Sequence, residues 1–166
     1  MNTLKKILPF FYCWLACVAI QLPMVWWLYP SPQDFLPTET VEGIYDFNGG
    51  GARTRSTTKI GARSLFCGIS YLGPSTACGQ KFSGQSVKAK LARYKHLFGE
   101  GEVVVEARGA SGDETVYSPE LRMELWRFNS GLEVVRMAIF FSLFLVYPIF
   151  KFKLFNFFKR GNQNGR

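Results

Sequence analysis

Two cysteines near the middle of the chain are the residues whose type and spacing most invite a chemical role. Cys67 and Cys78 lie in the stretch CGISYLGPSTACG, with ten residues between them. Such a pair could be half of a metal site, a redox couple or a structural disulfide. Zinc would need two further ligands, and a thioredoxin-like redox pair has two intervening residues. The choice depends on the compartment, so the placement of the chain relative to a membrane comes first.

A charge-free run of 23 residues, Ile7 to Tyr29, directly follows two lysines. A bilayer core needs roughly 20 helical residues, so this run is long enough to cross it. The run closes with Trp26, Trp27 and Tyr29, whose rings favour the level of the lipid headgroups. A cleaved signal peptide is the alternative, but its apolar part is usually about 7–15 residues long, and no small-x-small cleavage site follows here. We therefore expect a transmembrane helix over residues 7–29.

A second apolar segment lies near the other end of the chain. Its charge-free core, residues 137–150, has 14 residues and is short for a membrane span. Extending it to 134–152 gives 19 residues, nearly the required length, but includes Arg136 and Lys151. Long cationic side chains near the ends of a span can reach the headgroups, where Lys153 would also lie. We expect a second transmembrane helix over 132–152, with these three cations at the membrane surface.

Charge asymmetry predicts the orientation of the two helices. All 12 acidic residues fall between Asp34 and Glu133. Apart from Arg136, the sequence outside this window carries seven basic residues and no acidic ones. The positive-inside rule then places residues 1–6 and the basic tail 153–166 in the cytoplasm, and residues 30–131 outside it. We expect a multi-pass protein of the inner (plasma) membrane with both termini in the cytoplasm.

The formal net charge of +8 does not indicate a nucleic-acid partner. The region between the helices, counted with Arg136, holds 13 basic and 12 acidic residues and is nearly neutral. A nucleic-acid-binding domain would present a net basic surface. The lipid bilayer is the partner that the charge pattern predicts.

The region between the helices has the glycine-punctuated, β-rich pattern of a small sheet domain. VEGIYDF predicts a strand at about 41–47, and residues 54–70 predict one long strand or two strands with a bulge at Gly61. Residues 101–109 and 113–118 predict a β-hairpin. Residues 86–98 fit both a strand and a helix, and we favour a strand because the flanking segments need neighbours in a sheet.

A helical pattern returns before the second span. Ser118 can cap a helix, Pro119 suits its first position, and Leu121, Leu125 and Phe128 repeat at helical spacing. We expect this short helix over 119–128, ended by the NSG sequence at 129–131.

The predicted fold is therefore an α+β membrane protein. Two transmembrane helices flank a small antiparallel β domain of about five strands, either barrel-like or sandwich-like. In architecture alone, this arrangement resembles small bacterial inner-membrane proteins that carry one β domain between two helices.

With the central region outside the cytoplasm, the cysteine pair is best explained as a disulfide between Cys67 and Cys78. Disulfides persist in that compartment, and the only histidine in the chain is His96, so zinc would lack ligands. Cys13 and Cys17 fall inside the first helix, where thiols pack as small hydrophobic groups. We expect neither a metal site nor a cofactor.

Other polar residues offer weaker candidates for chemistry. His96 is the only candidate general base, and Glu102 and Glu106 could share one face as paired carboxylates or could simply be solvated. The loop GGGARTRSTTK carries Arg53, Arg55 and Lys59, a candidate site for an anion or an acidic partner. It lacks the spacing of a phosphate-binding P-loop, and a flexible hairpin tip is the alternative. We expect no catalytic residues.

Three functions are compatible with this pattern. The first is a non-enzymatic membrane protein whose outer β domain binds or scaffolds an envelope protein. The second is an immunity or envelope-stress protection protein that acts against a membrane-targeted toxin. The third, a membrane-bound enzyme, is the least supported, because no polar constellation for catalysis is recognisable.

Overall fold

The structure is a computed structural model that describes residues 2–51, 55–75 and 78–161. Side chains are described for residues 7–51, 55–75 and 78–148. The chain divides into two compact units. The helical unit consists of Met1–Met24 and Leu132–Arg166, and the β unit consists of Val25–Gly131.

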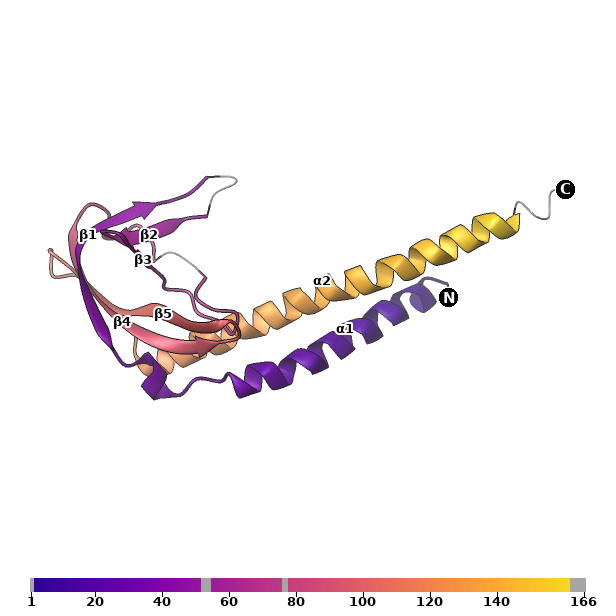
Figure 1. The fold of residues 1–166 in the computed structure, drawn as a ribbon, viewed down its shortest axis with the longest axis horizontal. Coiled ribbons are helices and arrows are strands. Elements are labelled where there is room, and N and C mark those ends of the chain that lie inside the picture. The colour runs from indigo at the N-terminus through magenta and orange to yellow at the C-terminus, as the bar shows by residue number, and fades with distance from the viewer. Residues whose placement is uncertain (1, 52–54, 76–77, 162–166) are drawn as a thin grey trace. The chain divides into compact units, whose positions relative to one another are not determined.

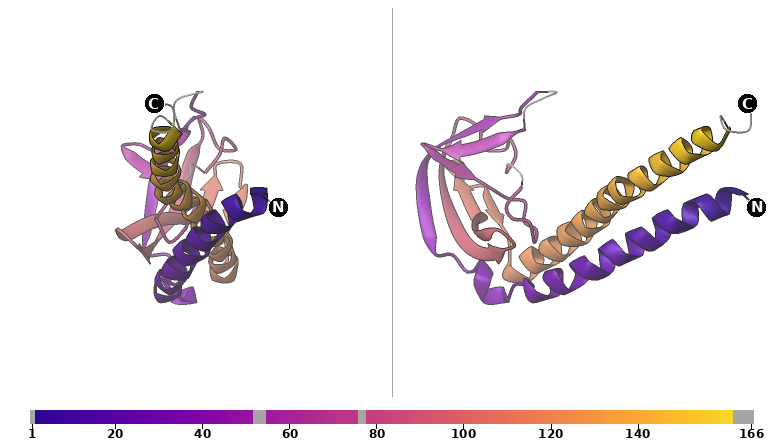
Figure 2. Two further views of the ribbon diagram at one scale, coloured as in Figure 1. Left: turned by 90° about the vertical axis from the view of Figure 1, so that its right-hand side faces the viewer. Right: turned by 45° about the vertical axis from the view of Figure 1, so that its right-hand side comes forward.

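The helical unit contains most of α1, Asn2–Trp27, and the distal part of α2, Pro119–Gly161. The two helices run side by side in this unit (Figures 1 and 2). Both contain segments that are long and apolar enough to cross a membrane, within Ile7–Trp27 and Pro119–Pro148.

The surface of the helical unit is strongly apolar. Ile20 and Leu22 of α1 are exposed, as are Phe140, Leu143 and Phe144 of α2. Water-soluble proteins rarely expose contiguous apolar surface of this kind, because it is costly to hydrate. The surface is suited to contact with lipid chains.

The β unit begins with the short 3-10 helix η1, Pro32–Phe35, and contains six strands among its described residues. Their bounds are β1 Glu39–Asn48, β2 Thr57–Ile60, β3 Arg63–Leu65, β4 Ser86–His96, β5 Gly99–Gly109 and β6 Glu114–Val116. They form one antiparallel sheet in the order β3-β2-β1-β4-β5-β6. The predicted antiparallel domain is confirmed, with six strands instead of about five. The sheet is open, with β3 and β6 at its edges, so the expectation of a closed barrel or a sandwich is wrong.

Most strands lie where the sequence predicts them. The strand expected at 41–47 lies within β1, the ambiguous segment 86–98 forms β4, and the predicted hairpin is formed by β5 and β6. The segment around Gly61 differs from the prediction. Gly61 lies in the tight turn between β2 and β3 rather than in a long strand or a bulge, and its φ of 58° is left-handed. Glycine adopts that conformation without a steric penalty.

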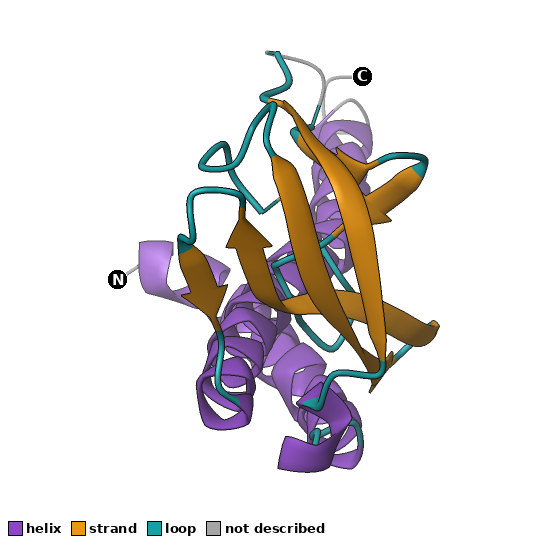
Figure 3. Cartoon of the chain, turned by 90° about the vertical axis from the view of Figure 1, so that its left-hand side faces the viewer, coloured by secondary structure: helices purple, strands orange, loops and turns teal. Residues whose placement is uncertain are grey.

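The sheet is strongly curved, because β1 changes partner along its length (Figures 1 and 3). Its residues 39–44 pair with β4, whereas residues 45–48 pair with β2. Gly43 precedes this change, and a Cβ atom there would lie 2.9 Å from Cγ2 of Ile60. The absence of a side chain at position 43 therefore leaves room for the β2–β3 hairpin to pack against β1.

A bulge in β5 adds to this curvature. Lys90 lies opposite Glu106, but the next residue, Leu91, lies opposite Val104, so Val105 is an extra residue in β5. Such a bulge bends and twists its strand. The backbone N–H of Val104 also donates to the carbonyl of Phe66, directly after β3, at 2.8 Å. This hydrogen bond links the chain after one edge strand to β5 near the other edge, and the sheet encloses an inner face.

The inner face carries one hydrophobic core. Its buried members come from β1 to β5 and from the loop before β4: Tyr45, Ile60, Leu65, Phe82, Val87, Ala89, Leu91, Val104 and Ala107. On the opposite, outer face of β4 and β5, side chains are buried where other elements pack against the sheet. There, Phe35 of η1 contacts the ring of Tyr94, with 5.9 Å between the ring centroids.

The buried side of α2 differs from the predicted one. Of the residues that define the predicted apolar stripe, Leu121 is 42% and Phe128 65% exposed, and Leu125 is only half-buried. The fully buried side chains recur every fourth residue instead, as Arg122, Trp126 and Ser130. The same spacing continues in the helical unit with Val134, Ala138, Ser142 and Val146. One stripe of α2 is therefore buried along both units.

The expected helix end at 129–131 is also wrong, because α2 continues without interruption to Gly161. The predicted start is confirmed, since Pro119 is the first helical residue and Oγ of Ser118 accepts a hydrogen bond from the N–H of Leu121. Asn and Ser side chains disfavour a helix when they bind the local backbone. Here they bind the β unit: Asn129 Nδ2 donates to the carbonyl of Ile69, and Ser130 Oγ accepts from the N–H of Tyr71, both at 3.0 Å.

Arg122 joins α2 to two parts of the β unit. Its guanidinium donates to the carbonyl of Cys67 at 2.7 Å and to the carbonyl of Val104 in β5. The guanidinium carbon also lies 3.8 Å from the ring centroid of Tyr117. A buried cation is costly unless its donors are satisfied, so these contacts have to form together.

We expect Arg122→Met to destabilise the β unit by about 2–4 kcal/mol, because the buried carbonyl of Val104 and the part-buried carbonyl of Cys67 lose a charged donor. Arg127→Met is the matched control, since Arg127 lies on the same helix but is exposed. The measurement is urea unfolding of the full chain in detergent, followed by near-UV circular dichroism. Equal midpoints for the two variants would show that Arg122 does not hold the unit together.

Candidate functional site

The predicted disulfide is present in the structure. Cys67 and Cys78 are bonded, with their Cα atoms 4.9 Å apart, while Cys13 and Cys17 of α1 are free thiols. The backbone N–H of Cys78 donates to Oγ1 of Thr58 in β2 at 3.0 Å. The carbonyl of Cys67 accepts a hydrogen bond from Arg122 of α2. The disulfide loop is therefore anchored to β2 through Cys78 and to α2 through Cys67. These contacts give the cysteines a structural role.

The three candidate acid–base residues do not form a site. His96 lies at the end of β4, and its Nδ1 accepts a hydrogen bond from the N–H of Phe98 at 3.2 Å. Glu106 lies opposite Lys90 of β4. Lys90 is six residues from His96 along the same strand, which corresponds to about 20 Å at the usual rise per residue. The imidazole and this carboxylate are therefore too far apart to act on one substrate atom.

Glu102 and Glu106 lie on opposite faces of the sheet. Glu102 lies opposite Arg93, and Glu106 lies opposite Lys90. Because Arg93 and Lys90 are three residues apart on β4, their side chains point to different faces. The bulge at Val105 is the cause, since residues four apart in a regular strand would share a face. Of the two alternatives, the one in which the two carboxylates share one face is therefore wrong.

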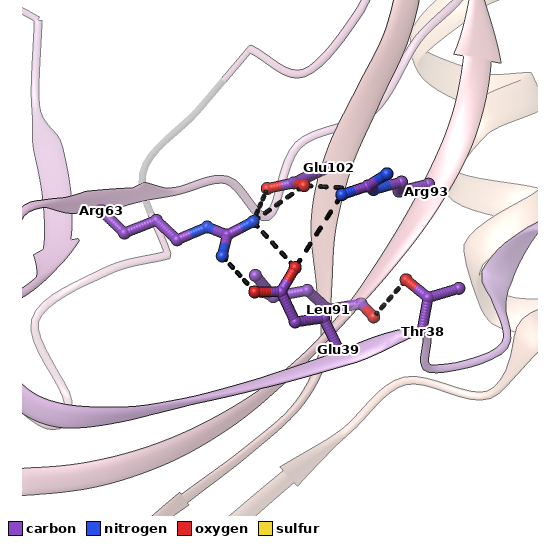
Figure 4. A network of polar contacts seen from close by, with 6 residues as sticks. All are labelled: Thr38, Glu39, Arg63, Leu91, Arg93 and Glu102. Atoms are coloured by element: carbon purple, nitrogen blue, oxygen red, sulfur yellow. Dashed lines mark hydrogen bonds and ion pairs between the residues drawn. The ribbon is translucent and has the colours of Figure 1, made fainter.

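Glu102 belongs instead to a polar network on the inner face, which we call the Arg63 network (Figure 4). Arg63 of β3 donates to both carboxylate oxygens of Glu39 in β1, the Nη2 contact being 3.0 Å. Its Nη2 also lies 2.9 and 2.7 Å from the carboxylate oxygens of Glu102 in β5. Arg93 of β4 donates to Glu102 at 3.3 Å and completes the network. The four side chains connect four strands.

The Arg63 network is electrically balanced. Hydrogen bonds from Arg63 hold the pKa of the Glu39 carboxyl below its ordinary value near 4.5, and both carboxylates raise the pKa of Arg63. The Glu39 carboxylate is thus held ionised against a cation, which suits a tie between strands rather than proton transfer. Sequence reasoning missed this network, because its members are scattered from position 39 to 102 and only the strand register brings them together.

The predicted cationic loop is partly described. Arg53 lies outside the described residues, whereas Arg55 and Lys59 are exposed. Neither forms an ion pair with another described residue, although Lys59 lies opposite Asp46 in the β1–β2 register. Two cations are therefore available near the tip of this hairpin.

Of the predicted membrane-interface residues, Trp26 and Trp27 end the apolar segment of α1. Trp26 and Trp27 are exposed, and the ring of Tyr29 contacts Trp126 edge to face, with 5.6 Å between the centroids. Arg136 is exposed on α2. Lys151 and Lys153 belong to α2, but their side chains lie outside the described set.

Neither metal-site geometry nor comparison with known proteins supplies a function. Within the described ranges, no group of three or more His, Cys, Asp or Glu side chains is placed to hold a metal ion. No protein-family model, curated protein or solved structure matches the chain. Function is therefore inferred from the arrangement of the described side chains.

The Arg63 network predicts a specific dependence of stability on pH. A carboxyl with a lowered pKa stabilises the fold above its unfolded pKa, and this contribution is lost as pH falls through the folded value. We expect Arg63→Gln to lower the thermal midpoint by a few degrees at pH 7. The difference from wild type should shrink as the pH falls below about 4.5, the ordinary value from which the pKa of Glu39 is lowered.

Thermal unfolding of the full chain in detergent between pH 7 and pH 3 measures this dependence. Arg55→Gln is the control, because it removes an exposed cation with no ion pair to a described residue. A difference between wild type and Arg63→Gln that stays constant across this range would contradict the assigned role of the pair.

Proposed function

We propose that the chain is a two-span protein of the inner membrane whose β unit lies outside the cytoplasm and binds an envelope protein. In this proposal both termini are cytoplasmic, and the protein works by holding its partner rather than by catalysis.

Three observations support the membrane topology. The two candidate spans are apolar and expose large hydrophobic side chains. Basic residues are concentrated beyond the outer ends of the spans, as the positive-inside rule requires of cytoplasmic segments. The disulfide between Cys67 and Cys78 belongs to the β unit, and such bonds persist mainly in oxidising compartments.

The observation that carries the proposed binding role is the free end of the β1–β2 hairpin. Beyond Tyr45, β1 pairs with β2 alone, so residues 46–48 leave one edge of the strand unpaired among the described residues. Figure 1 shows this part of the hairpin standing apart from β4 and β5. We call the described residues of this part of the hairpin, 46–51 and 55–59, the arm.

The arm combines two features of a protein-binding surface. An unpaired strand edge can accept a strand from another chain through backbone hydrogen bonds. The exposed cations Arg55 and Lys59 can select an acidic partner and set its register. By contrast, the charges on the outer face of β4 are largely neutralised, since Lys88 pairs with Glu42 and Lys90 with Glu106.

Site-specific photocrosslinking in intact membranes tests this role. With a photoreactive residue at position 59, we expect one discrete adduct with another envelope protein, identified by mass spectrometry. The same residue at position 88, on the paired outer face, is the matched control and should give no such adduct. Charge reversal of Arg55 to Glu should lower the yield at position 59 several-fold, because the acidic partner loses an attractive charge.

Two results would count against the proposal. Equal adducts from positions 59 and 88 would show that the arm has no special role. An adduct consisting only of a second copy of this chain would replace the envelope partner with self-association.

A further inference from the structure

A groove of about 550 Å3 lies within the β unit, beside the point where the chain leaves α1. One wall is the segment from Trp27 to Pro30. The other is the end of the β4–β5 hairpin, where the lining residues are Lys95, His96, Leu97, Gly99 and Glu100, with Phe98 next to them in the chain. The volume is in the range of sites that hold small molecules.

The aromatic side chains around the groove indicate the depth at which it lies. Trp27 is 80% exposed, and Phe98 at the tip of the hairpin is 76% exposed. Trp27 ends the apolar segment Ile7–Trp27, and tryptophan at the end of a span favours the headgroup level. On the proposed topology, on which this inference rests, the groove therefore opens among lipid headgroups.

The groove lining includes one cation, Lys95, and two carboxylates, Glu100 and Asp34. Lys95 and Glu100 both line it and lie directly opposite each other in the β4–β5 register. Neither forms an ion pair with any described residue, unlike Lys90 and Glu106, which pair across the same two strands. Asp34, another lining residue, is already bound to the N–H and the hydroxyl of Ser31.

We propose that the groove binds one phospholipid whose zwitterionic headgroup carries a phosphate and a primary ammonium, as in phosphatidylethanolamine. Lys95 binds the phosphate, and Glu100 accepts hydrogen bonds from the ammonium. A quaternary ammonium lacks the N–H donors that Glu100 requires, and a glycerol headgroup lacks the positive charge. The exposed rings of Trp27 and Phe98 then contact the upper part of the acyl chains.

Native mass spectrometry of the full chain measures the lipid that it retains on release from nanodiscs. The discs contain equal amounts of phosphatidylethanolamine, phosphatidylcholine and phosphatidylglycerol. We expect one retained phosphatidylethanolamine per chain, at least five-fold more often than either other lipid. Equal retention of the three lipids, preferential retention of phosphatidylglycerol, or no retained lipid would each overturn the proposal.

Paired substitutions locate the site. Lys95→Gln with Glu100→Gln should lower retention of phosphatidylethanolamine at least five-fold, because both headgroup contacts are lost. Glu42→Gln with Lys88→Gln is the matched control, since it removes one carboxylate and one ammonium from the same sheet, outside the groove lining. An intact disulfide between Cys67 and Cys78, seen as a mobility shift on a non-reducing gel, verifies that each variant folds. Unchanged retention in the groove variant would overturn the assignment.

Competition separates a lipid site from a site for free anions. Inorganic phosphate at millimolar concentration should not displace the retained lipid, and displacement would reassign the groove to soluble anions. The outcome is independent of the proposed partner. If the protein retains no lipid but still gives the crosslinked adduct at position 59, only the lipid inference is wrong. If the adduct is absent but phosphatidylethanolamine is retained, only the proposed partner binding is wrong.

Discussion

The buried guanidinium of Arg122 is the interaction on which the β unit depends most. It bonds the carbonyl of Cys67 in the disulfide loop and the carbonyl of Val104 in β5, and it lies against the ring of Tyr117. A guanidinium removed from water is costly without hydrogen-bond partners, so the two carbonyls that accept from Arg122 tie the helix, the loop and the strand together. Trp126 and Ser130 extend the same helical face, and the covered side of the unit is built around that stripe.

Electrostatic pairing gives the open sheet a second set of constraints. The Arg63 network joins strands that are distant in the sequence, and the Val104–Phe66 hydrogen bond joins the chain after β3 to β5. Most charges of the sheet are neutralised in this way. The exceptions among the described strand residues are Asp46 and Lys59 in the arm and Lys95 with Glu100 in the groove, and these charges remain available to other molecules.

Local patterns predicted much of the fold. Alternating apolar residues indicated β1, β4 and the β5–β6 hairpin, and compartment reasoning favoured the disulfide. Features set by tertiary contacts were not predictable. Asn129 and Ser130 predicted a helix end, because the sequence does not reveal their hydrogen bonds to Ile69 and Tyr71. Likewise, the bulge at Val105 moves Glu106 to the outer face, and the Arg63 network depends on strand register alone.

The central claim is that the β unit is held outside the cytoplasm between two membrane spans. The most direct measurement fuses a reporter that is active only outside the cytoplasm after Lys59 or after Arg160, and compares its activity in intact cells. We expect an active reporter after Lys59 and an inactive one after Arg160, because the intervening apolar segment of α2 returns the chain to the cytoplasm. A reporter that is active at both positions, or inactive at both, would contradict the two-span topology and the location proposed for the β unit.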